Sequence, residues 1–504
     1  MLKNLLAAIK EENLTEQLYH SLIGVEIEEH RVDKNGKLSQ TEYPKDLASR
    51  SYHPYLQTDF AETQHEIISD PSPYISGVLD QLDNLQTVLN RSIQKDEYIW
   101  PLSMPPALSE DDKRYIKDHF GRPAYAKYRN YLTKKYGIKR KIITGVHINF
   151  SMPEPVINRL HRHYKSQYAN LIEFKNDLYF QIAQNFVLNR WLITYLFGAS
   201  PIAEKGFFNE QTAKQFTHPV RSIRSGKYGY NNFPQDGVGP EAYTSIDAYV
   251  SEINQAIQTK KLYGLAEFYG PVRLRGQDNI EEYKTNGIRY LEFRTFDNTP
   301  FTPNGFSRHA LYFLKFFFIY LMVSSVDQTD IKDKLFQAFA DNNRVAAEDP
   351  VSPTFKQDAG IKIFENLIDM SVSLNAHSEQ LSALDDFSEI ITHPEITASA
   401  MLEEKIKNNS LMDYGMQVSK RWKQNRSDEK AILPTLEKLP LKAQKLIYRA
   451  IQLGIRYYVV NDENGSALIT LTFNNVTQVV FSDKISDKNP TQILLEMFPE
   501  LKRM

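Results

Sequence analysis

The sequence predicts an α+β fold in which strands and helices are grouped along the chain. Apolar residues recur with helical periodicity in three long segments, at 178–196, 308–326 and 443–453. Shorter strand-like runs lie between helices, at 24–32, 142–150 and 288–295. Because strands and helices do not alternate regularly, they favour an α+β fold over a doubly wound parallel sheet.

The composition is that of an ordinary globular protein rather than a disordered chain. Apolar residues make up 41% and charged residues 24% of the 504 residues. The 60 basic and 62 acidic side chains give a formal net charge of −2, which does not support a nucleic-acid partner. Cysteine is absent, so disulfides, thiolate metal sites and a cysteine nucleophile are excluded. A metal ion would need oxygen or imidazole ligands.

Two apolar segments bear on location. The apolar run within residues 1–12 is too short, and too interrupted by charged residues, for a signal peptide. It predicts an amphipathic helix instead. The segment 310–326 is shorter than the roughly 20 apolar residues of a membrane-spanning helix and contains Lys315. It is better explained as a buried core helix. We therefore expect a soluble, cytoplasmic protein without a membrane partner.

The pattern changes twice in the C-terminal third. Residues 327–354 are polar and weakly patterned, which predicts a surface excursion. After Leu453, the strand-like runs 457–460 and 468–473 flank an Asn464-Gly465 turn, which predicts a β-hairpin. A short helix is expected at 491–497. These features predict one domain over residues 1–453 and a small hairpin-containing extension over residues 454–504.

The strand-like segments carry polar side chains on one face and apolar side chains on the other, because side-chain direction alternates along a strand. The polar faces consist of Glu26 and Glu28, of His147, Asn149 and Ser151, and of Glu292 and Arg294. Each has an ordinary explanation: a solvated face, a hydrogen-bonded structural histidine and an intrastrand ion pair. Their recurrence in separate segments favours a shared functional face.

A fourth segment, 58–66, would place Asp59, Glu62 and Glu66 on one side if it were helical. Clustered carboxylates repel one another, and binding a hard divalent cation offsets that repulsion. No Gly-Lys pair is followed by Ser or Thr in the frame that a P-loop requires. The residues therefore favour a Mg²⁺–nucleotide site in which the metal carries much of the phosphate recognition.

Long motifs surround these residues. In chain order they are G-V-E-I-E-E-H-R from Gly24, T-D-F-A-E from Thr58, W-P-L-S-M-P from Trp100, Y-R-N-Y-L from Tyr128, G-V-H-I-N-F-S from Gly145, Y-L-F-G-A-S-P from Tyr195, S-I-R-S-G-K-Y-G-Y from Ser222, F-Y-G-P-V-R from Phe268 and Y-L-E-F-R-T-F-D from Tyr290. In these motifs the sequence resembles the bacterial glutamate–cysteine ligase family. The resemblance extends from about residue 20 to about residue 325, and we find little to match beyond Val326.

The resemblance implies a fold and a reaction. The fold would be α+β, with a curved antiparallel sheet forming a funnel-like active site among surrounding helices, as in the glutamine synthetase-like superfamily. ATP would phosphorylate the γ-carboxylate of glutamate, and the amine of cysteine would attack the acyl phosphate to give γ-glutamylcysteine, the first step of glutathione biosynthesis. The alternative is a γ-glutamyl ligase that uses a different small amine or amino acid as acceptor.

The resemblance also implies roles for individual residues. The ligands of Mg²⁺, or of Mn²⁺ in its place, would be Glu26, Glu28, Asp59, Glu66, His147 and Glu292. Glu292 and Arg294 would be catalytic, because a guanidinium can hold two oxygens of the transferring phosphoryl group. Asn149 would join Arg294 in binding the nucleotide. The pocket for cysteine would consist of Phe60, Tyr128, Leu132, Ile143, Arg224, Tyr230 and Tyr269. Its apolar walls would suit a small thiol side chain, and Arg224 and the tyrosine hydroxyls would bind a carboxylate.

Residues from Ala450 onward resemble the connecting segment of bifunctional glutathione-synthesising enzymes, which continue into an ATP-grasp domain. We therefore expect small-molecule partners only, namely glutamate, cysteine and ATP, with a separate glutathione synthetase acting downstream. With glycine supplied, this chain is expected to leave the dipeptide product unchanged.

Overall fold

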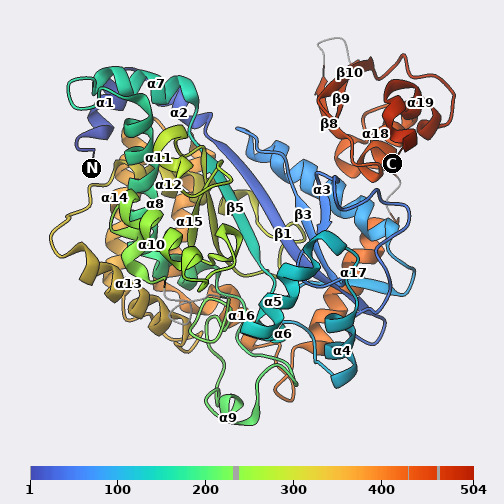
Figure 1. The fold of residues 1–504 in the computed structure, drawn as a ribbon, viewed down its shortest axis with the longest axis horizontal. Coiled ribbons are helices and arrows are strands. Elements are labelled where there is room, and N and C mark those ends of the chain that lie inside the picture. Colours follow the sequence, from blue (N-terminus) through green and yellow to red (C-terminus); the bar gives the residue numbers. More distant parts are fainter. Residues whose placement is uncertain (1, 231–237, 429–430, 462–465, 504) are drawn as a thin grey trace.

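The computed structural model of the protein describes residues 2–230, 238–428, 431–461 and 466–503. Within these residues the strands form two antiparallel sheets, one large and one small (Figure 1). The large sheet has the order β2-β3-β1-β5-β7-β6, and β4 pairs with the C-terminal end of β1. Its strands are β1 (Leu22–Asp33), β2 (Leu56–Thr58), β3 (Gln64–Ile68), β4 (Glu97–Trp100), β5 (Val146–Ser151), β6 (Val272–Arg275) and β7 (Tyr290–Phe296). This arrangement confirms the expected mixture of helices and antiparallel sheet.

Helices pack around the large sheet and also precede and follow the small one (Figure 1). Those of the first half are α1 (Leu5–Glu11), α2 (Thr15–Tyr19), α3 (Ile75–Ser92), α4 (Glu110–Asp118), α5 (Ala126–Tyr136), α6 (Ile138–Lys141), α7 (Glu154–His163), α8 (Leu171–Phe197), α9 (Glu210–Ala213) and α10 (Ile246–Gln258). Those of the second half are α11 (Glu282–Asn286), α12 (Arg308–Val323), α13 (Ile331–Ala346), α14 (Gln357–Ser373), α15 (Ser378–Thr392), α16 (Ala398–Glu403), α17 (Met412–Asp428), α18 (Leu441–Gln452) and α19 (Pro490–Met497).

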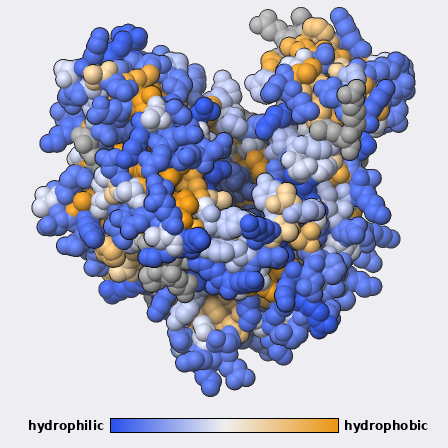
Figure 2. All heavy atoms as spheres, in the orientation of Figure 1, coloured by the Kyte–Doolittle hydropathy of each residue, from blue (hydrophilic) through white to orange (hydrophobic). Residues whose placement is uncertain are grey.

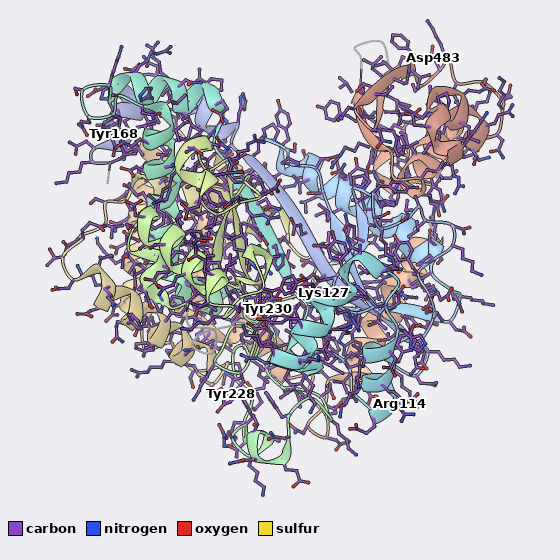
Figure 3. The ribbon with its side chains drawn as sticks, viewed as in Figure 1. Arg114, Lys127, Tyr168, Tyr228, Tyr230 and Asp483 are labelled. Carbon is purple, nitrogen blue, oxygen red and sulfur yellow. The ribbon has the colours of Figure 1, made fainter. Side chains whose placement is uncertain are left out.

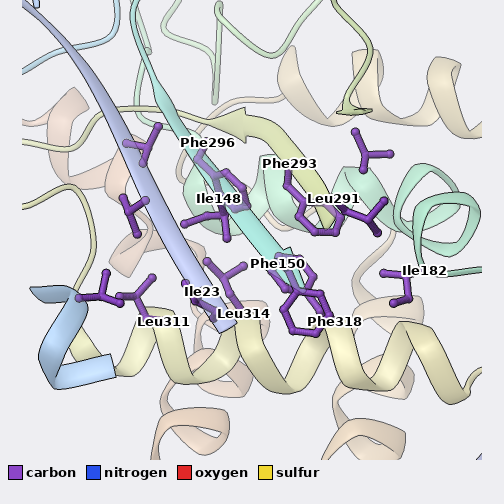
Figure 4. Packing of buried hydrophobic residues seen from close by; sticks show 14 of the residues in the cluster. Ile23, Ile148, Phe150, Ile182, Leu291, Phe293, Phe296, Leu311, Leu314 and Phe318 are labelled. Carbon is purple, nitrogen blue, oxygen red and sulfur yellow. The ribbon is translucent and has the colours of Figure 1, made fainter. Parts of the chain in front are cut away.

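The apolar face of the large sheet packs against α8 and α12 (Figure 4). Its buried side chains come from alternate positions of the central strands, namely Ile23, Val25, Ile27, Ile148, Phe150, Leu291 and Phe293. The ring of Phe293 stacks on Phe318 of α12, with ring centroids 4.0 Å apart. Burying this face leaves the opposite, polar face of the same strands directed away from the helices. The helices predicted at 178–196 and 308–326 are thus confirmed as α8 and α12.

Helix α12 is a core helix, as its sequence predicted. Lys315 within it is buried, and its ammonium donates a hydrogen bond to the carbonyl of Pro73 at 2.9 Å. Among the helices that the structure describes, none combines the length and the apolarity needed to cross a membrane. The amphipathic helix expected at the N-terminus is α1, whose Leu5, Ala8 and Ile9 are buried.

Two expectations about local structure are wrong. Residues 327–354 are not simply a surface excursion, because they contain α13, which packs along α8. Its buried stripe includes Ala338 and Asn342, so apolar periodicity underestimates it; Asn342 accepts a hydrogen bond from Thr194 at 2.7 Å. Residues 58–66 are not a helix but the end of β2, a turn and the start of β3.

The C-terminal part contains the small sheet, with strands in the order β10-β9-β8. They are β8 (Arg456–Asn461), β9 (Ala467–Phe473) and β10 (Val476–Phe481). The predicted hairpin is confirmed by the antiparallel pairing of β8 with β9, although its Asn464-Gly465 turn lies outside the described residues. The helices predicted at 443–453 and 491–497 are α18 and α19. The domain boundary between residues 453 and 454 stays a prediction.

Candidate active site

A pocket of about 290 Å³ opens on the polar face of the large sheet. Most of the residues predicted from the alternating strands line it, together with side chains from α5, α6 and the loops around them. Figure 2 shows this side of the molecule hollowed near its centre. In Figure 3, Tyr230 lies near the middle of the molecule, whereas Tyr228 lies further toward the edge.

The strand register brings the candidate metal ligands together. Glu26 of β1 pairs with His147 of β5, and Glu28 of β1 pairs with Glu66 of β3. Strand β7, which carries Glu292, follows on the other side of β5. Paired residues in neighbouring antiparallel strands project from the same face, so side chains far apart in the sequence converge there.

The convergence is close enough for a metal ion. One ligand atom each from Glu26, His147 and Glu292 lie within 4.8 Å of one another. The Nδ1 atom of His147 lies 3.4 Å from a Glu26 oxygen and 3.7 Å from a Glu292 oxygen, and its Nε2 atom lies 3.7 Å from a Glu28 oxygen. Within the described residues, His147 Nε2 makes no hydrogen bond. Carboxylate oxygens with an imidazole fit a hard divalent cation.

The electrostatics of the carboxylates agree with a cation site. Burial raises the pKa of Glu66 well above its usual range, and the negative charges of Glu26 and Asp59 raise it further. Burial, followed by the charge of Asp59, raises the pKa of Glu28 to about 8. Carboxylates that are costly to ionise in the bare protein gain the most from a bound cation.

Asp59 and Glu66 both line the pocket, whereas Glu62 does not. The side-chain amide of Gln64 lies 3.4 Å from an oxygen of Asp59 and 3.4 Å from an oxygen of Glu28. Glu62 instead forms an ion pair with Arg50 at 2.7 Å and accepts a hydrogen bond from the backbone of Gly121 at 3.0 Å. A turn between two strands, rather than a helix, therefore separates Glu62 from the other two carboxylates.

Glu292 lies at the junction between the carboxylates and a cluster of arginines. Arg294 forms an ion pair with it, and one of its carboxylate oxygens lies 3.7 Å from Arg273 and 3.2 Å from Arg275. Burial would raise the pKa of Glu292, but Arg294 and then Arg273 and Arg275 outweigh burial and hold this pKa below its usual range. Arg294 also donates a hydrogen bond to the hydroxyl of Tyr230 at 2.8 Å. The intrastrand ion pair is thus present, and it lies inside the pocket.

The sequence predictions missed Arg273 and Arg275. Both line the pocket from β6, where Arg273 pairs with Glu292 of the neighbouring strand β7. The run Val272–Arg275 shows the same alternation of apolar and polar side chains as the other strands. That alternation was the available signal, but four residues are too few for it to stand out from chance.

The predicted cysteine pocket is brought together in part. Phe60, Tyr128, Leu132, Tyr230 and Tyr269 line the pocket, whereas Ile143 and Arg224 do not. Ile143 is fully buried in the cluster behind Phe60 and Leu132. It supports the wall rather than forming its surface.

Arg224 is buried beside Gly145 and lines a small cavity behind Tyr230. It donates a hydrogen bond to the carbonyl of Arg294 at 3.1 Å and lies 3.9 Å from Asp297. A Cβ atom on Gly145 would lie 2.1 Å from the Arg224 guanidinium, so glycine leaves the room that this side chain occupies. Arg224 therefore braces the strand that carries Arg294.

Asn149 also lies outside the pocket wall. Its side-chain amide donates a hydrogen bond to Glu26 at 2.7 Å, so in this structure it orients a candidate metal ligand. A second set of cations was not predicted: Arg122, Arg129 and Lys141 line the pocket on the side of α5 and α6. Lys141 ends a run of basic residues, yet it is buried. Burial lowers the pKa of its ammonium to about 7.

The sequence profile described as glutamate–cysteine ligase matches residues 6–264 and 262–345. The chain belongs to the glutamate–cysteine ligase family. The match confirms the resemblance seen in the sequence and extends it past residue 326, through α13. In this glutamate–cysteine ligase family member, the matched region therefore includes a segment that seemed unmatched in the sequence.

Known relatives agree with the assignment. The chain is 34% identical to the glutathione biosynthesis bifunctional protein GshAB of Streptococcus mutans, over 95% of this chain and 62% of that protein. It is 32% identical to GshAB of Enterococcus faecalis, over 90% of this chain and 59% of that protein. The chain thus spans about three fifths of the length of these bifunctional relatives.

Solved structures show the same fold. A bifunctional glutathione synthetase from Pasteurella multocida superposes with a TM-score of 0.85 at 29% identity, covering 97% of this chain and 64% of that one. Glutamate–cysteine ligase from Francisella tularensis, solved in complex with AMP, superposes with a TM-score of 0.71 at 22% identity, covering 83% of this chain and 92% of that one.

Proposed function

We propose that this chain catalyses the ATP-dependent ligation of the γ-carboxylate of L-glutamate to the amine of L-cysteine, the first step of glutathione biosynthesis. The observation that supports it best is the buried junction at Glu292, where a carboxylate–histidine cluster meets three arginines in one pocket. Such a site can bind a metal–triphosphate and a second anionic substrate side by side. Membership of the glutamate–cysteine ligase family selects this reaction among those that such a site could carry out.

The side chains that would hold Mg²⁺, or Mn²⁺, share the polar face of β1, β3, β5 and β7 and the turn after β2. They are Glu26, Glu28, Asp59, Glu66, His147 and Glu292. Bound there, the metal would supply neutralisation of the triphosphate charge. Within the described residues the Nε2 atom of His147 makes no hydrogen bond, and this free acceptor position and the raised pKa of Glu28 and of Glu66 fit the role of a metal site.

The arginines would stabilise the transfer. An oxygen of the glutamate γ-carboxylate attacks the γ-phosphorus of ATP, the bond to ADP breaks, and γ-glutamyl phosphate forms. Arg294, oriented by Glu292 and Tyr230, is placed to bind two oxygens of the transferring group. Arg273 and Arg275 supply positive charge for the remaining phosphate oxygens. The cysteine amine then attacks the acyl carbon, phosphate leaves, and the amine loses a proton.

We further infer that the large sheet acts as the funnel of a glutamine synthetase-like fold, since the pocket is lined by side chains of its polar face. Because the reaction consumes ATP, we propose the cytoplasm as its compartment. Phe60, Tyr128, Leu132, Tyr230 and Tyr269 would form the wall around the acceptor.

The test measures phosphate release from ATP with Mg²⁺ and glutamate, with and without cysteine, and identifies the product by mass. We expect phosphate release to require both amino acids and the product to be γ-glutamylcysteine. Release that depends on glutamate but is stimulated by another amine, and not by cysteine, would favour the alternative acceptor. The absence of glutamate-dependent release would overturn the proposal.

A matched pair of variants isolates the carboxylate cluster. Glu66→Gln removes a carboxylate from the pocket, whereas Glu62→Gln makes the same change in the neighbouring turn, outside the pocket. We expect phosphate release to be lost in the first and to stay within a few-fold of the parent in the second.

A further inference from the structure

Lys141 is a buried cation on the acceptor side of the pocket. It is the last residue of α6, 5% exposed, and it lines the pocket. Its ammonium lies 3.3 Å from the ring centroid of Tyr269, 5.2 Å from that of Tyr230 and 5.3 Å from that of Tyr136. Aromatic faces attract a cation, but they do not neutralise its charge as a carboxylate does.

The other cations of this pocket have partners. Arg122 donates a hydrogen bond to the carbonyl of Thr58, and Arg129 donates to the carbonyl of Phe60. The three arginines of β6 and β7 lie against Glu292. In the described part of the chain, Lys141 alone among the pocket's cations makes no direct hydrogen bond or ion pair with a carboxylate or a carbonyl, although the charges of Asp59, Glu28 and Glu267 act on it at longer range. A buried charge of this kind is costly unless a ligand pairs with it.

The position of Lys141 relative to Arg294 indicates which ligand group it meets. Tyr230 lies between them, with its hydroxyl 2.8 Å from Arg294 and its ring 5.2 Å from the Lys141 ammonium. An acceptor amine that attacks the acyl phosphate must lie near Arg294. In an α-amino acid, the carboxylate is attached to the same carbon as that amine. The carboxylate of a bound acceptor must therefore lie close to Arg294 and Tyr230 as well.

We propose that Lys141 binds the α-carboxylate of the acceptor and thereby selects an α-amino acid over a simple amine. The proposal rests on the proposed ligase function and narrows its acceptor class. It assigns to Lys141 the carboxylate recognition that the sequence predicted for Arg224, whose guanidinium is engaged with the carbonyl of Arg294 behind the pocket wall. The apolar part of the acceptor would then face Phe60 and Leu132.

The test compares acceptors that differ only in the carboxylate. Phosphate release is measured with cysteine against cysteamine, and with 2-aminobutyrate against propylamine, at saturating ATP and glutamate. The proteins are the parent chain, Lys141→Met, Lys141→Gln and the control Lys134→Met, which removes an exposed lysine of α5 outside the pocket. Thermal melting of each protein reports whether it is folded.

We expect the parent to prefer each carboxylated acceptor over its decarboxylated counterpart. Both Lys141 variants should raise the KM for cysteine by roughly ten- to hundred-fold, the size of a lost hydrogen bond to a charged group. They should leave kcat/KM for cysteamine and the KM for ATP and glutamate within about twofold. Lys134→Met should behave as the parent.

Three results would overturn the proposal. One is a parent enzyme that uses cysteine and cysteamine equally, which decides the matter even if the variants do not fold. Another is an unchanged preference in folded Lys141 variants. The last is a rise, in the Lys141 variants, of the KM for glutamate instead of that for cysteine. It would mean that the Lys141 ammonium binds the donor, glutamate, and not the acceptor. Failure of the parent to release phosphate with any acceptor would instead contradict the proposed function itself.

Discussion

The two sheets of this protein each bury one face, but their opposite faces differ in character and in exposure. In the large sheet, the second face carries carboxylates, a histidine and arginines, and several of them are enclosed: Glu28, His147 and Glu292 are each at most 3% exposed. In the small sheet, the second face is open to solvent. Tyr458 of β8 is 63% exposed and Val479 of β10 is 54% exposed.

On these second faces, both sheets therefore depart from the usual relation between polarity and burial. Exposed apolar side chains on the small sheet cost little, because much of any protein surface is apolar. Enclosed charges on the large sheet are expensive, and they persist where a ligand or a metal offsets their cost. Figure 2 shows apolar side chains at the surface of the C-terminal part and a hollow in the body of the molecule. The alternation of polar and apolar residues identifies the two faces of a strand, but burial of the polar face is what indicates a functional site.

The largest effect is expected for Glu292→Gln. This change removes a candidate metal ligand and leaves Arg294, Arg273 and Arg275 without their shared partner. Turnover should fall by about 10²–10³-fold or more, and the free energy of unfolding by about 3–5 kcal/mol, the cost of breaking a buried ion pair. Phosphate release and thermal melting measure the two effects. Near-normal turnover of the variant would contradict the role of Glu292 in the active site.

Arg294→Lys should have the next largest effect. Lysine keeps the charge but not the planar pair of donors, so turnover should fall by roughly 10²-fold. The KM for ATP should change less, because an interaction made in the transition state appears in turnover. Steady-state kinetics separate the two parameters. Weakened ATP binding with unchanged turnover would contradict the assigned role.

Glu28→Gln should lower turnover but, unlike Glu292→Gln, should stabilise the metal-free protein. Burial and Asp59 raise the pKa of Glu28 to about 8, so ionising it in the folded state is unfavourable at neutral pH. Removing the charge should raise the free energy of unfolding at pH 8 by about 1–3 kcal/mol. A raised folded pKa costs stability as pH rises above the unfolded value, so the gain should vanish below about pH 4.5. Denaturant unfolding at both pH values measures it; destabilisation at pH 8 would contradict this account.

Ile469→Val probes the covered face of the small sheet. Ile469 of β9 is fully buried, and deleting one methylene from a buried site costs about 0.5–1.5 kcal/mol. Turnover at a temperature where the protein is folded should not change, because the residue lies outside the pocket. Denaturant unfolding and phosphate release together test this. A loss of turnover in the folded variant would show that the small sheet acts on the site.

The smallest effect is expected for Val479→Thr on the open face of the same sheet. The side chain is 54% exposed, and threonine keeps the β-branched shape that suits a strand. Stability should change by less than about 0.5 kcal/mol, with turnover unchanged. A larger loss of stability, measured by the same unfolding experiment, would mean that this face is covered in solution.

Much of the site could be predicted from short patterns. Alternation in β1, β5 and β7 identified Glu26, Glu28, His147, Glu292 and Arg294, all of which line the pocket. The same reasoning failed where the pattern was short or mixed. Strand β6 has too few residues to show its alternation clearly, and α13 buries Asn342 and Ala338 in place of large apolar side chains.

Other features depend on contacts that no local pattern contains. Lys141 belongs to a basic run that looks exposed, and only the packing of α5 and α6 against the aromatic wall encloses it. Arg224 was predicted to bind the acceptor carboxylate, yet its side chain is buried in the space beside Gly145, behind the wall of the pocket.

Local sequence patterns were sufficient to predict which side of each central strand is polar, which segments form the long core helices, and which family the motifs resemble. Side-chain direction along a strand is set by the backbone, so faces are a local property. The tertiary structure alone decided that Glu26 meets His147, that Glu28 meets Glu66, and that Glu62 turns away to Arg50. Pairing depends on the register between strands that are distant in the chain. The alternation of side chains along one strand carries no information about which residue of another strand each of them will face.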